Sequence, residues 1–361
     1  SEQAGVAHLV SAVITKGTEN LSALEIAEKV ESIGAGLGAD ASTDYFSLSL
    51  KTVSSDFPPM LKLLGEIMRS PVFPESEVEL ERKLTLQGIL SQKEQPFNVA
   101  FNQLRQQMYP QHPYGISVLG TETSVAKITR QNLQQYHQTY FRPDNLVISL
   151  SGRITKEQAV NLISEVFSDW QNPPQPSPVA QLNTLNSNPS QAEIIQDTQQ
   201  SIVMLGYLGT NVNSDDYPVL KLLSTYLGNG LSSRLFVELR EKRGLAYDVS
   251  AFFPTRLDTA PFITYMGTAP ANTDIAIEGL STEVERITKE TLTEEEFHGA
   301  KNKLLGQYAL GKQTNGEIAQ TFGWYETLGL GVEFDQTFQA SIPPITPAMA
   351  QEVASKYLSQ P

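Results

Sequence analysis

Apolar and polar residues alternate in two segments of the chain, DYFSLSLKTV at 44–53 and APFITYMGTA at 260–269. This alternation has the period of a β-strand with one buried face, so we expect a strand in each segment. Apolar residues then recur at helical spacing after a turn, which predicts two helices behind each strand. These helices are expected at 60–71 and 73–90 in the first half and at 270–287 and 292–310 in the second.

The two halves resemble one another in the second of these helices. The aligned pairs are Phe73 with Leu292, Glu77 with Glu296 and Arg82 with Lys301. Two unrelated domains can share one strand–helix–helix pattern by chance, but the aligned charges favour a duplicated domain. Strands and helices in this order predict an α+β fold, in which an antiparallel sheet carries helices on one face.

One change of composition divides the chain. Residues 171–193, QNPPQPSPVAQLNTLNSNPSQAE, are rich in Pro, Asn, Gln and Ser and poor in aliphatic side chains, which is typical of an extended linker. We therefore expect a first domain at 1–170, a linker at 171–193 and a second domain at 194–361. A length of 361 residues also favours two domains over one.

Charge and composition exclude several classes of function. The formal net charge is −14, whereas a nucleic-acid-binding surface has to be basic, so we exclude nucleic acid as a partner. The sequence has no apolar run of about 18 residues that would span a membrane. It has no cysteine, which excludes disulfides and thiolate metal sites.

Few residues in the chain are candidates for catalysis. The four histidines, His8, His112, His137 and His298, are far apart in the sequence, and each is interpreted first as a packed or locally hydrogen-bonded side chain. The glycine-rich pieces GAGLGAD and LGNGLSS lack a P-loop lysine or a dinucleotide-binding fingerprint. Nor does any nucleophile–base arrangement stand out, so an enzyme acting by itself has no visible chemistry.

The segment SSRLFVELREKRGLAY at 232–247 predicts a helix that Ser232 or Ser233 caps and that ends before Gly244. Tyr247 would lie on the strand that follows, on the same face as its apolar neighbours. From these residues alone, Tyr247 is interpreted as a core residue and Arg240 as a surface cation near a helix C-terminus.

Three segments together resemble the pitrilysin, insulinase and mitochondrial-processing-peptidase family of zinc proteases. GVAHLVSAVITKGT at 5–18 is similar to the zinc-binding helix of that family, residues 112–152 to its helix-to-last-strand segment, and residues 227–253 to the substrate-facing region of its second domain. The resemblance covers nearly the whole chain and implies two homologous α/β-roll domains. The strand hairpin that usually precedes the zinc helix is missing, so we expect the first sheet to be incomplete in this numbering.

The family's metal helix has the motif His-x-x-Glu-His, because two histidines four positions apart share a helix face and the glutamate activates a zinc-bound water. The resemblance places the first histidine on His8, the glutamate on Ser11 and the second histidine on Ala12. The third ligand, a distant glutamate, falls on Gly88. Glu81 survives nearby, but a single imidazole and Glu81 do not make a catalytic site, so we expect no metal and no cofactor in this chain.

The resemblance changes the interpretation of Arg240 and Tyr247. In the family, an arginine and a tyrosine seven positions apart bind the substrate carbonyl and stabilise the oxyanion at the zinc site of a facing domain. Arg240 and Tyr247 have this spacing in the matching context LREKRGLAY. Both are donors that can stabilise developing negative charge in a dry cleft.

A missing zinc site beside a retained donor pair is similar to the zinc-free subunit of the heterodimeric bacterial members. The expected partners are a zinc-bearing homologous subunit, which would hold the zinc, and an unfolded peptide that binds as an added strand. The alternative is a purely structural homologue, like the core subunits of respiratory complexes with this fold. The compartment stays open between the bacterial cell envelope or periplasm and the cytoplasm, because a targeting segment could lie upstream.

Overall fold

The computed structural model describes residues 2–178, 182, 185 and 188–361, and part of the expected linker lies outside these residues. The chain forms two compact units. Unit 1 comprises residues 1–91, 116–182 and 314–329, and unit 2 comprises residues 92–115, 183–313 and 330–361. We expected each domain to be one continuous stretch of sequence, with boundaries near residues 170 and 194. In the structure each unit also contains a segment from the other half of the chain: residues 92–115 belong to unit 2, and residues 314–329 belong to unit 1.

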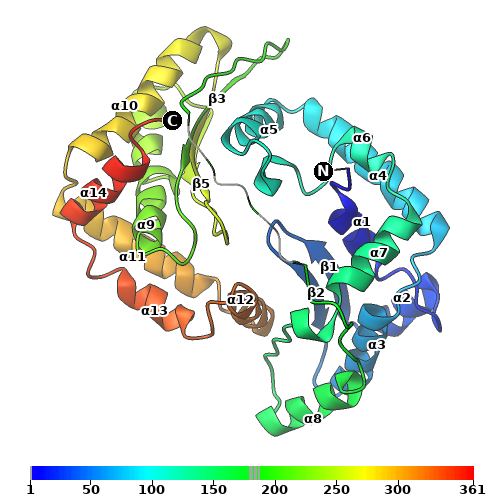
Figure 1. The fold of residues 1–361 in the computed structure, drawn as a ribbon. Coiled ribbons are helices and arrows are strands. Elements are labelled where there is room, and N and C mark those ends of the chain that lie inside the picture. Colours follow the sequence, from blue (N-terminus) through cyan, green and yellow to red (C-terminus); the bar gives the residue numbers. More distant parts are fainter. Residues whose placement is uncertain (1, 179–181, 183–184, 186–187) are drawn as a thin grey trace. The chain divides into compact units, whose positions relative to one another are not determined.

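Unit 1 combines one small sheet with a group of helices (Figure 1). Its strands are β1 (Gly36–Ala41) and β2 (Phe46–Lys51). Its helices are α1 (Val6–Val13), α2 (Ala23–Glu31), α3 (Phe57–Arg69), α4 (Glu75–Lys93), α6 (Glu122–Val125), α7 (Arg130–Tyr140), the short η2 (Pro143–Asn145), α8 (Lys156–Phe167) and α12 (Asn315–Thr327). The strand expected at 44–53 and the helices expected at 60–71 and 73–90 are therefore confirmed as β2, α3 and α4.

The core of unit 1 is formed by α1, α2, α3, α4 and α7, and the β1–β2 hairpin packs against it. The strands pair antiparallel, with Leu37 opposite Leu50 and Ala39 opposite Leu48, and these four side chains pack against the buried core that includes Leu9 of α1. The opposite face carries small or polar residues such as Gly38 and Ser49, which follow from the alternation of the strand.

The last strand that the family resemblance implies at the end of 112–152 is not formed. Residues 146–151 have no assigned strand, and Val147, Ile148 and Leu150 are 38%, 39% and 38% exposed. A strand needs a neighbour to satisfy its backbone groups. The named ladder in the described part of unit 1 is β1–β2, and this segment joins neither of its strands.

Unit 2 contains a three-stranded sheet and its covering helices. The strands are β3 (Ser201–Leu208), β4 (Asp248–Phe252) and β5 (Pro261–Thr268). The helices are α5 (Pro96–Met108), η1 (Pro113–Gly115), α9 (Tyr217–Gly228), η3 (Phe236–Lys242), η4 (Pro270–Asn272), α10 (Thr273–Lys289), α11 (Glu294–Leu310), α13 (Phe334–Ser341) and α14 (Pro347–Tyr357). The strand expected at 260–269 is β5, and the helices expected at 270–287 and 292–310 are α10 and α11.

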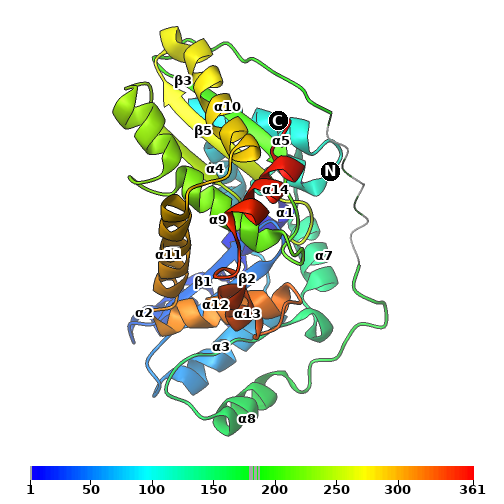
Figure 2. The same cartoon turned by 90° about the vertical axis from the view of Figure 1, so that its left-hand side faces the viewer.

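The sheet of unit 2 is antiparallel with the order β3-β5-β4. One face carries Val203, Val249 and Met266 into the main core, where α9 and α10 pack against the strands. In turn α14 contacts both of these helices, as the side view shows (Figure 2). An α+β fold with antiparallel sheets and packed helices is therefore confirmed.

The second face of this sheet also carries a helix, α5, which comes from the first half of the sequence (Figure 1). Phe97 and Phe101 of α5 make ring contacts with Tyr265 and Phe252 of the sheet. A Cβ at Gly206 would lie 2.5 Å from the Met108 sulfur, so a larger residue would require the side chains of α5 to shift. The expectation of helices on one face is thus incomplete for unit 2.

Several helices begin with capping boxes. At α11, Thr293 and Glu296 form a reciprocal capping box, and Ser22 and Glu25 do the same at α2.

Within the part of the chain that the structure describes, no helix is both long and apolar enough to span a bilayer.

Candidate functional site

Helix α1 positions the residues that align with the zinc-binding motif. Leu9, Val10 and Val13 are buried in the core of unit 1 and so fix the rotation of the helix. The Ser11 hydroxyl donates a hydrogen bond to the His8 carbonyl oxygen at 2.7 Å, one turn earlier on the same helix. Ser11 is therefore engaged with the helix backbone, and Ala12 beside it offers only a methyl group.

His8 itself is half-buried and faces acidic side chains from two other elements. Burial lowers the pKa of His8, while the nearby carboxylates of Glu81 on α4 and Asp40 on β1 oppose this effect. Gly88 lies two helical turns after Glu81, and a Cβ at Gly88 would meet no atom within 4 Å. The position of the family's third ligand is thus open space beside α4.

These residues do not fit a catalytic zinc ion. Such a site needs three protein ligands and an open coordination position. His8 supplies one nitrogen ligand. The Ser11 hydroxyl already donates to the helix backbone, Ala12 has only a methyl group and Gly88 only a hydrogen. Among the described residues, no group of three or more His, Cys, Asp or Glu side chains is arranged to hold a metal ion.

The segment that carries Arg240 is a π-helix, η3, where the sequence predicts an ordinary helix. Its C-terminus is where we expect it, because Gly244 adopts φ 62° and the Leu245 N–H donates to the Leu239 carbonyl at 2.9 Å. The predicted serine cap is not formed in the described structure: the buried Ser233 hydroxyl has no hydrogen-bond partner, and the Ser232 hydroxyl accepts from the Lys303 ammonium at 3.4 Å instead. Single π-helical turns are rare and frequently occur at functional sites.

Ion pairs lie along η3 and join a residue just before it to α10. Arg234, just before η3, places its Nε 2.7 Å from Glu283 of α10 and its Nη1 2.7 Å from Glu238. Lys242 also pairs with Glu238, at 2.7 Å. The Arg234–Glu283 pair thus ties the start of η3 to α10, whereas the Lys242–Glu238 pair lies within η3.

Arg240 and Tyr247 are both exposed. The Arg240 guanidinium lies 5.0 Å from the centroid of the Phe236 ring, and Tyr247 is 59% exposed just before β4. The Tyr247 N–H donates to the Gly267 carbonyl at 2.8 Å, which fixes its backbone to β5. Neither side chain makes a hydrogen bond or an ion pair with any residue that the structure describes. The interpretation of Tyr247 as a core residue is therefore wrong, and both donors are free to bind a ligand.

The remaining histidines lie apart from one another. His112 is buried and contacts Asp258 through Nε2 at 3.1 Å, and its Nδ1 accepts from the Tyr114 N–H at 3.1 Å. The Nε2 of His137 lies 2.7 Å from the Met68 carbonyl oxygen, and burial lowers the pKa of His137. His298 is exposed on α11. Sequence patterns do not reveal the His112–Asp258 contact, because its partners lie far apart in the chain.

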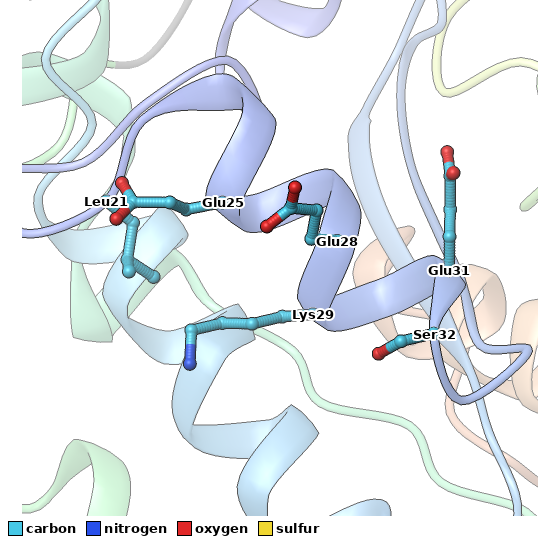
Figure 3. Close-up of a pocket in the computed structure, with 6 residues that line it drawn as sticks. All are labelled: Leu21, Glu25, Glu28, Lys29, Glu31 and Ser32. Atoms are coloured by element: carbon cyan, nitrogen blue, oxygen red, sulfur yellow. The ribbon is translucent and has the colours of Figure 1, made fainter.

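An open hollow along α2 is lined by Leu21, Glu25, Glu28, Lys29, Glu31 and Ser32 (Figure 3). Its carboxylates point into solvent from one helix, and Glu25 already accepts hydrogen bonds from the backbone N–H and hydroxyl of Ser22. A row of solvated acids on one helix supplies no catalytic geometry, so the candidate site remains that of Arg240 and Tyr247.

Comparison with known protein families matches both parts of the chain. Residues 1–122 match the family described as insulinase, peptidase family M16, and residues 127–304 match the M16 inactive domain. An uncharacterized zinc protease of Streptomyces coelicolor is 26% identical over 99% of this chain and 79% of its own length. The uncharacterized zinc protease YmxG of Bacillus subtilis is 26% identical over 88% of this chain and 76% of its own length.

Solved structures agree with this assignment. An M16 inactive-domain protein from Pseudomonas fluorescens superimposes with a TM-score of 0.91 at 25% identity, covering 99% of this chain and 86% of that one. A protease from Helicobacter pylori gives the same TM-score at 22% identity, over 99% of this chain and 88% of that one, which supports the fold. From these matches, the chain belongs to the insulinase family of peptidases, family M16.

Proposed function

We propose that this chain is the zinc-free, substrate-binding subunit of a heterodimeric zinc metalloendopeptidase that cleaves unfolded peptides. A homologous partner subunit carries the zinc ion and the general base. This chain supplies Arg240 and Tyr247, whose N–H and O–H groups donate to the substrate carbonyl and to the oxyanion that forms at the scissile bond. The chain itself binds no zinc and has no peptidase activity alone.

The single observation that carries this proposal is the contrast between the two sites. The positions that align with the metal site have lost their donors, and Gly88 opens onto empty space. Arg240 and Tyr247, by comparison, are exposed on an anchored π-helix and beside a strand, with their polar groups unused by the described residues. Preorganised donors without an internal partner are what an intersubunit oxyanion site requires.

The decisive experiment is affinity purification of this chain from its source, followed by metal analysis of the homologues that co-purify. We expect a subunit with an intact His-x-x-Glu-His motif and stoichiometric zinc. The isolated chain should not cleave a quenched fluorescent unfolded peptide, and mixing it with that subunit should restore cleavage. An assembly without a zinc-bearing homologue would instead support the purely structural alternative.

Substitution of the donor pair tests the role of this chain within the complex. Arg240→Ala should lower turnover by about 100-fold or more, as the loss of one oxyanion donor does elsewhere. Tyr247→Phe, which removes only the hydroxyl, should also lower it. Arg243→Ala, three residues from Arg240 and also exposed, is the matched control and should have little effect. Full activity of the Arg240→Ala complex would contradict the proposal.

A further inference from the structure

The buried side of α10, a helix that the structure describes in full, carries one charged side chain. The buried residues of this helix are Ala276, Gly279, Leu280, Glu283, Val284 and Ile287. All but Glu283 are apolar or glycine, and Glu283 is only 9% exposed. A carboxylate in such a position costs desolvation energy that an apolar side chain would not cost. What it contributes in return depends on the partner that it binds.

The partner of Glu283 is Arg234, just before η3. The Arg234 Nε lies 2.7 Å from Glu283 Oε2, and the Arg234 Nη1 lies 2.7 Å from Glu238 Oε1 within η3. The side chains of Arg234 and Glu283 are 21% and 11% exposed, so water and salt screen this pair little. A guanidinium that donates to carboxylates fixes direction as well as distance. Arg234 is therefore a directional link between α10 and the start of η3.

A second contact between these two helices lies one turn earlier on α10. A Cβ at Gly279 would lie 2.9 Å from Cδ2 of Leu239 in η3, so a larger residue there would displace the Leu239 side chain. Leu239 is fully buried, and its carbonyl accepts the Leu245 N–H at 2.9 Å. Glu283 and Gly279, four positions apart on one side of α10, thus meet the η3 segment at two points.

These contacts bear on the helical register of η3. A π-helix is rare, and its backbone bonds span five residues where those of an α-helix span four. Because a π-helix has more residues per turn, a return to α-helical bonding would rotate Arg240 about the helix axis relative to Arg234. Arg240 lies six positions after Arg234. With Arg234 held by Glu283, the register of η3 decides where the Arg240 guanidinium points.

Stability alone does not account for the Arg234–Glu283 pair. Replacement of a buried ion pair by well-packed apolar side chains is often neutral or stabilising, whereas removal of one partner leaves an unpaired charge. What the carboxylate adds over an apolar side chain is a defined direction for Arg234. A pair kept for positioning can therefore be made apolar without loss of stability, but not without loss of function.

We propose that Glu283 is a positioning residue for Arg240. Glu283 fixes Arg234, Arg234 fixes the start and the π-helical register of η3, and this register directs the Arg240 guanidinium. Glu283 acts only through Arg234. The inference rests on the function proposed for Arg240 and adds a residue on which that function depends.

The first test measures kinetics of the reconstituted complex with Glu283→Gln and with Arg234→Met/Glu283→Leu. Each should lower kcat about tenfold, because a small displacement of a catalytic group is costly. KM should change by less than about twofold, because the lost interaction belongs to the transition state. Urea unfolding of the double variant should keep the wild-type midpoint. Glu290→Gln, which removes an exposed carboxylate from an ion pair with Arg286 at the end of α10, is the matched control and should retain full kcat.

A second measurement needs no partner subunit. In NMR spectra of the isolated chain, the Arg240 Nε–Hε signal is assigned by its loss in Arg240→Lys. This signal senses the Phe236 ring, whose centroid lies 5.0 Å from the guanidinium. It should move from its wild-type position in Glu283→Gln and stay in place in Glu290→Gln.

The outcomes separate this inference from the function on which it rests. Full kcat with both Glu283 variants, beside a low rate for Arg240→Ala, would overturn the positioning role and leave the proposed function in place. A lower kcat with an unmoved Arg240 signal would show a merely structural role and would also overturn it. Full activity of Arg240→Ala would contradict the proposed function itself. In that case a moved Arg240 signal in Glu283→Gln still supports the positioning, and an unmoved one overturns it.

Discussion

The guanidinium of Arg240 lies 5.0 Å from the centroid of the Phe236 ring, one turn earlier on the same π-helix. Phe236 also packs against the buried core of unit 2, so its ring is fixed and restricts the guanidinium above it. A cation over an aromatic face gains on the order of 1 kcal/mol at a partly exposed site. Arg240 is thus preorganised by a contact that leaves its N–H groups available.

Phe236→Leu keeps an apolar side chain in the core and removes the ring beneath Arg240. If preorganisation contributes to catalysis, kcat of the reconstituted complex should fall by about two- to fivefold, which corresponds to the cation–π energy. Phe236→Tyr retains the ring and should keep the original rate. Equal rates for the leucine and tyrosine variants would show that the ring does not position Arg240.

Two glycines should respond in opposite directions to the same substitution. A Cβ at Gly228 would lie 1.8 Å from the backbone nitrogen of Ala251, so Gly228→Ala should lower the free energy of unfolding by about 3 kcal/mol. Gly88, in the middle of α4, has free space at that position, so Gly88→Ala should raise it by about 0.5 to 1 kcal/mol. Urea unfolding of both variants measures the signs, and a stabilised Gly228→Ala would contradict the packing of α9 on β4.

Lys221 gives the stability of unit 2 a specific dependence on pH. Burial, and then the charge of Arg256, lowers the pKa of Lys221 from 10.5 to about 8. Between pH 8 and pH 10.5 the unfolded chain still binds the proton that folded Lys221 has released, so stability should rise with pH, by up to about 3 kcal/mol.

Lys221→Met should remove this contribution. Chemical unfolding of both proteins from pH 7 to pH 10.5 measures the difference between them, which cancels the titration of the buried tyrosines. Between pH 8 and pH 10.5, the free energy of unfolding of the wild-type protein should rise relative to that of the variant. Parallel stability curves would show that Lys221 titrates normally in the folded state.

The degenerate metal-site positions on α1 and α4 suggest a gain-of-function test. The double variant Ala12→His/Gly88→Glu would give His8 two further ligands of the kind and spacing that the family uses. Because α1 and α4 are in place and Gly88 faces open space, we expect about one zinc ion per chain by elemental analysis after dialysis. Each single variant serves as the control and should bind much less zinc. A folded double variant without zinc would mean that α1 and α4 do not present these positions to one another.

The local sequence of this protein determined part of its secondary structure. The alternation in 44–53 and 260–269 predicted β2 and β5, and helical spacing predicted α3, α4, α10 and α11, because the period of buried side chains differs between strands and helices. The sequence alone also shows that Ser11, Ala12 and Gly88 cannot act as zinc ligands, since that depends only on the chemistry of each side chain.

Only the tertiary structure decided the features that depend on contacts between distant segments. It placed α5 on the second face of the unit 2 sheet, left residues 146–151 without a strand partner among the described residues, and made η3 a π-helix. It also exposed Tyr247, which strand alternation assigns to the core. The periodicity of a segment records which of its faces is apolar, whereas the partner that covers that face is chosen by long-range packing, which no local pattern contains.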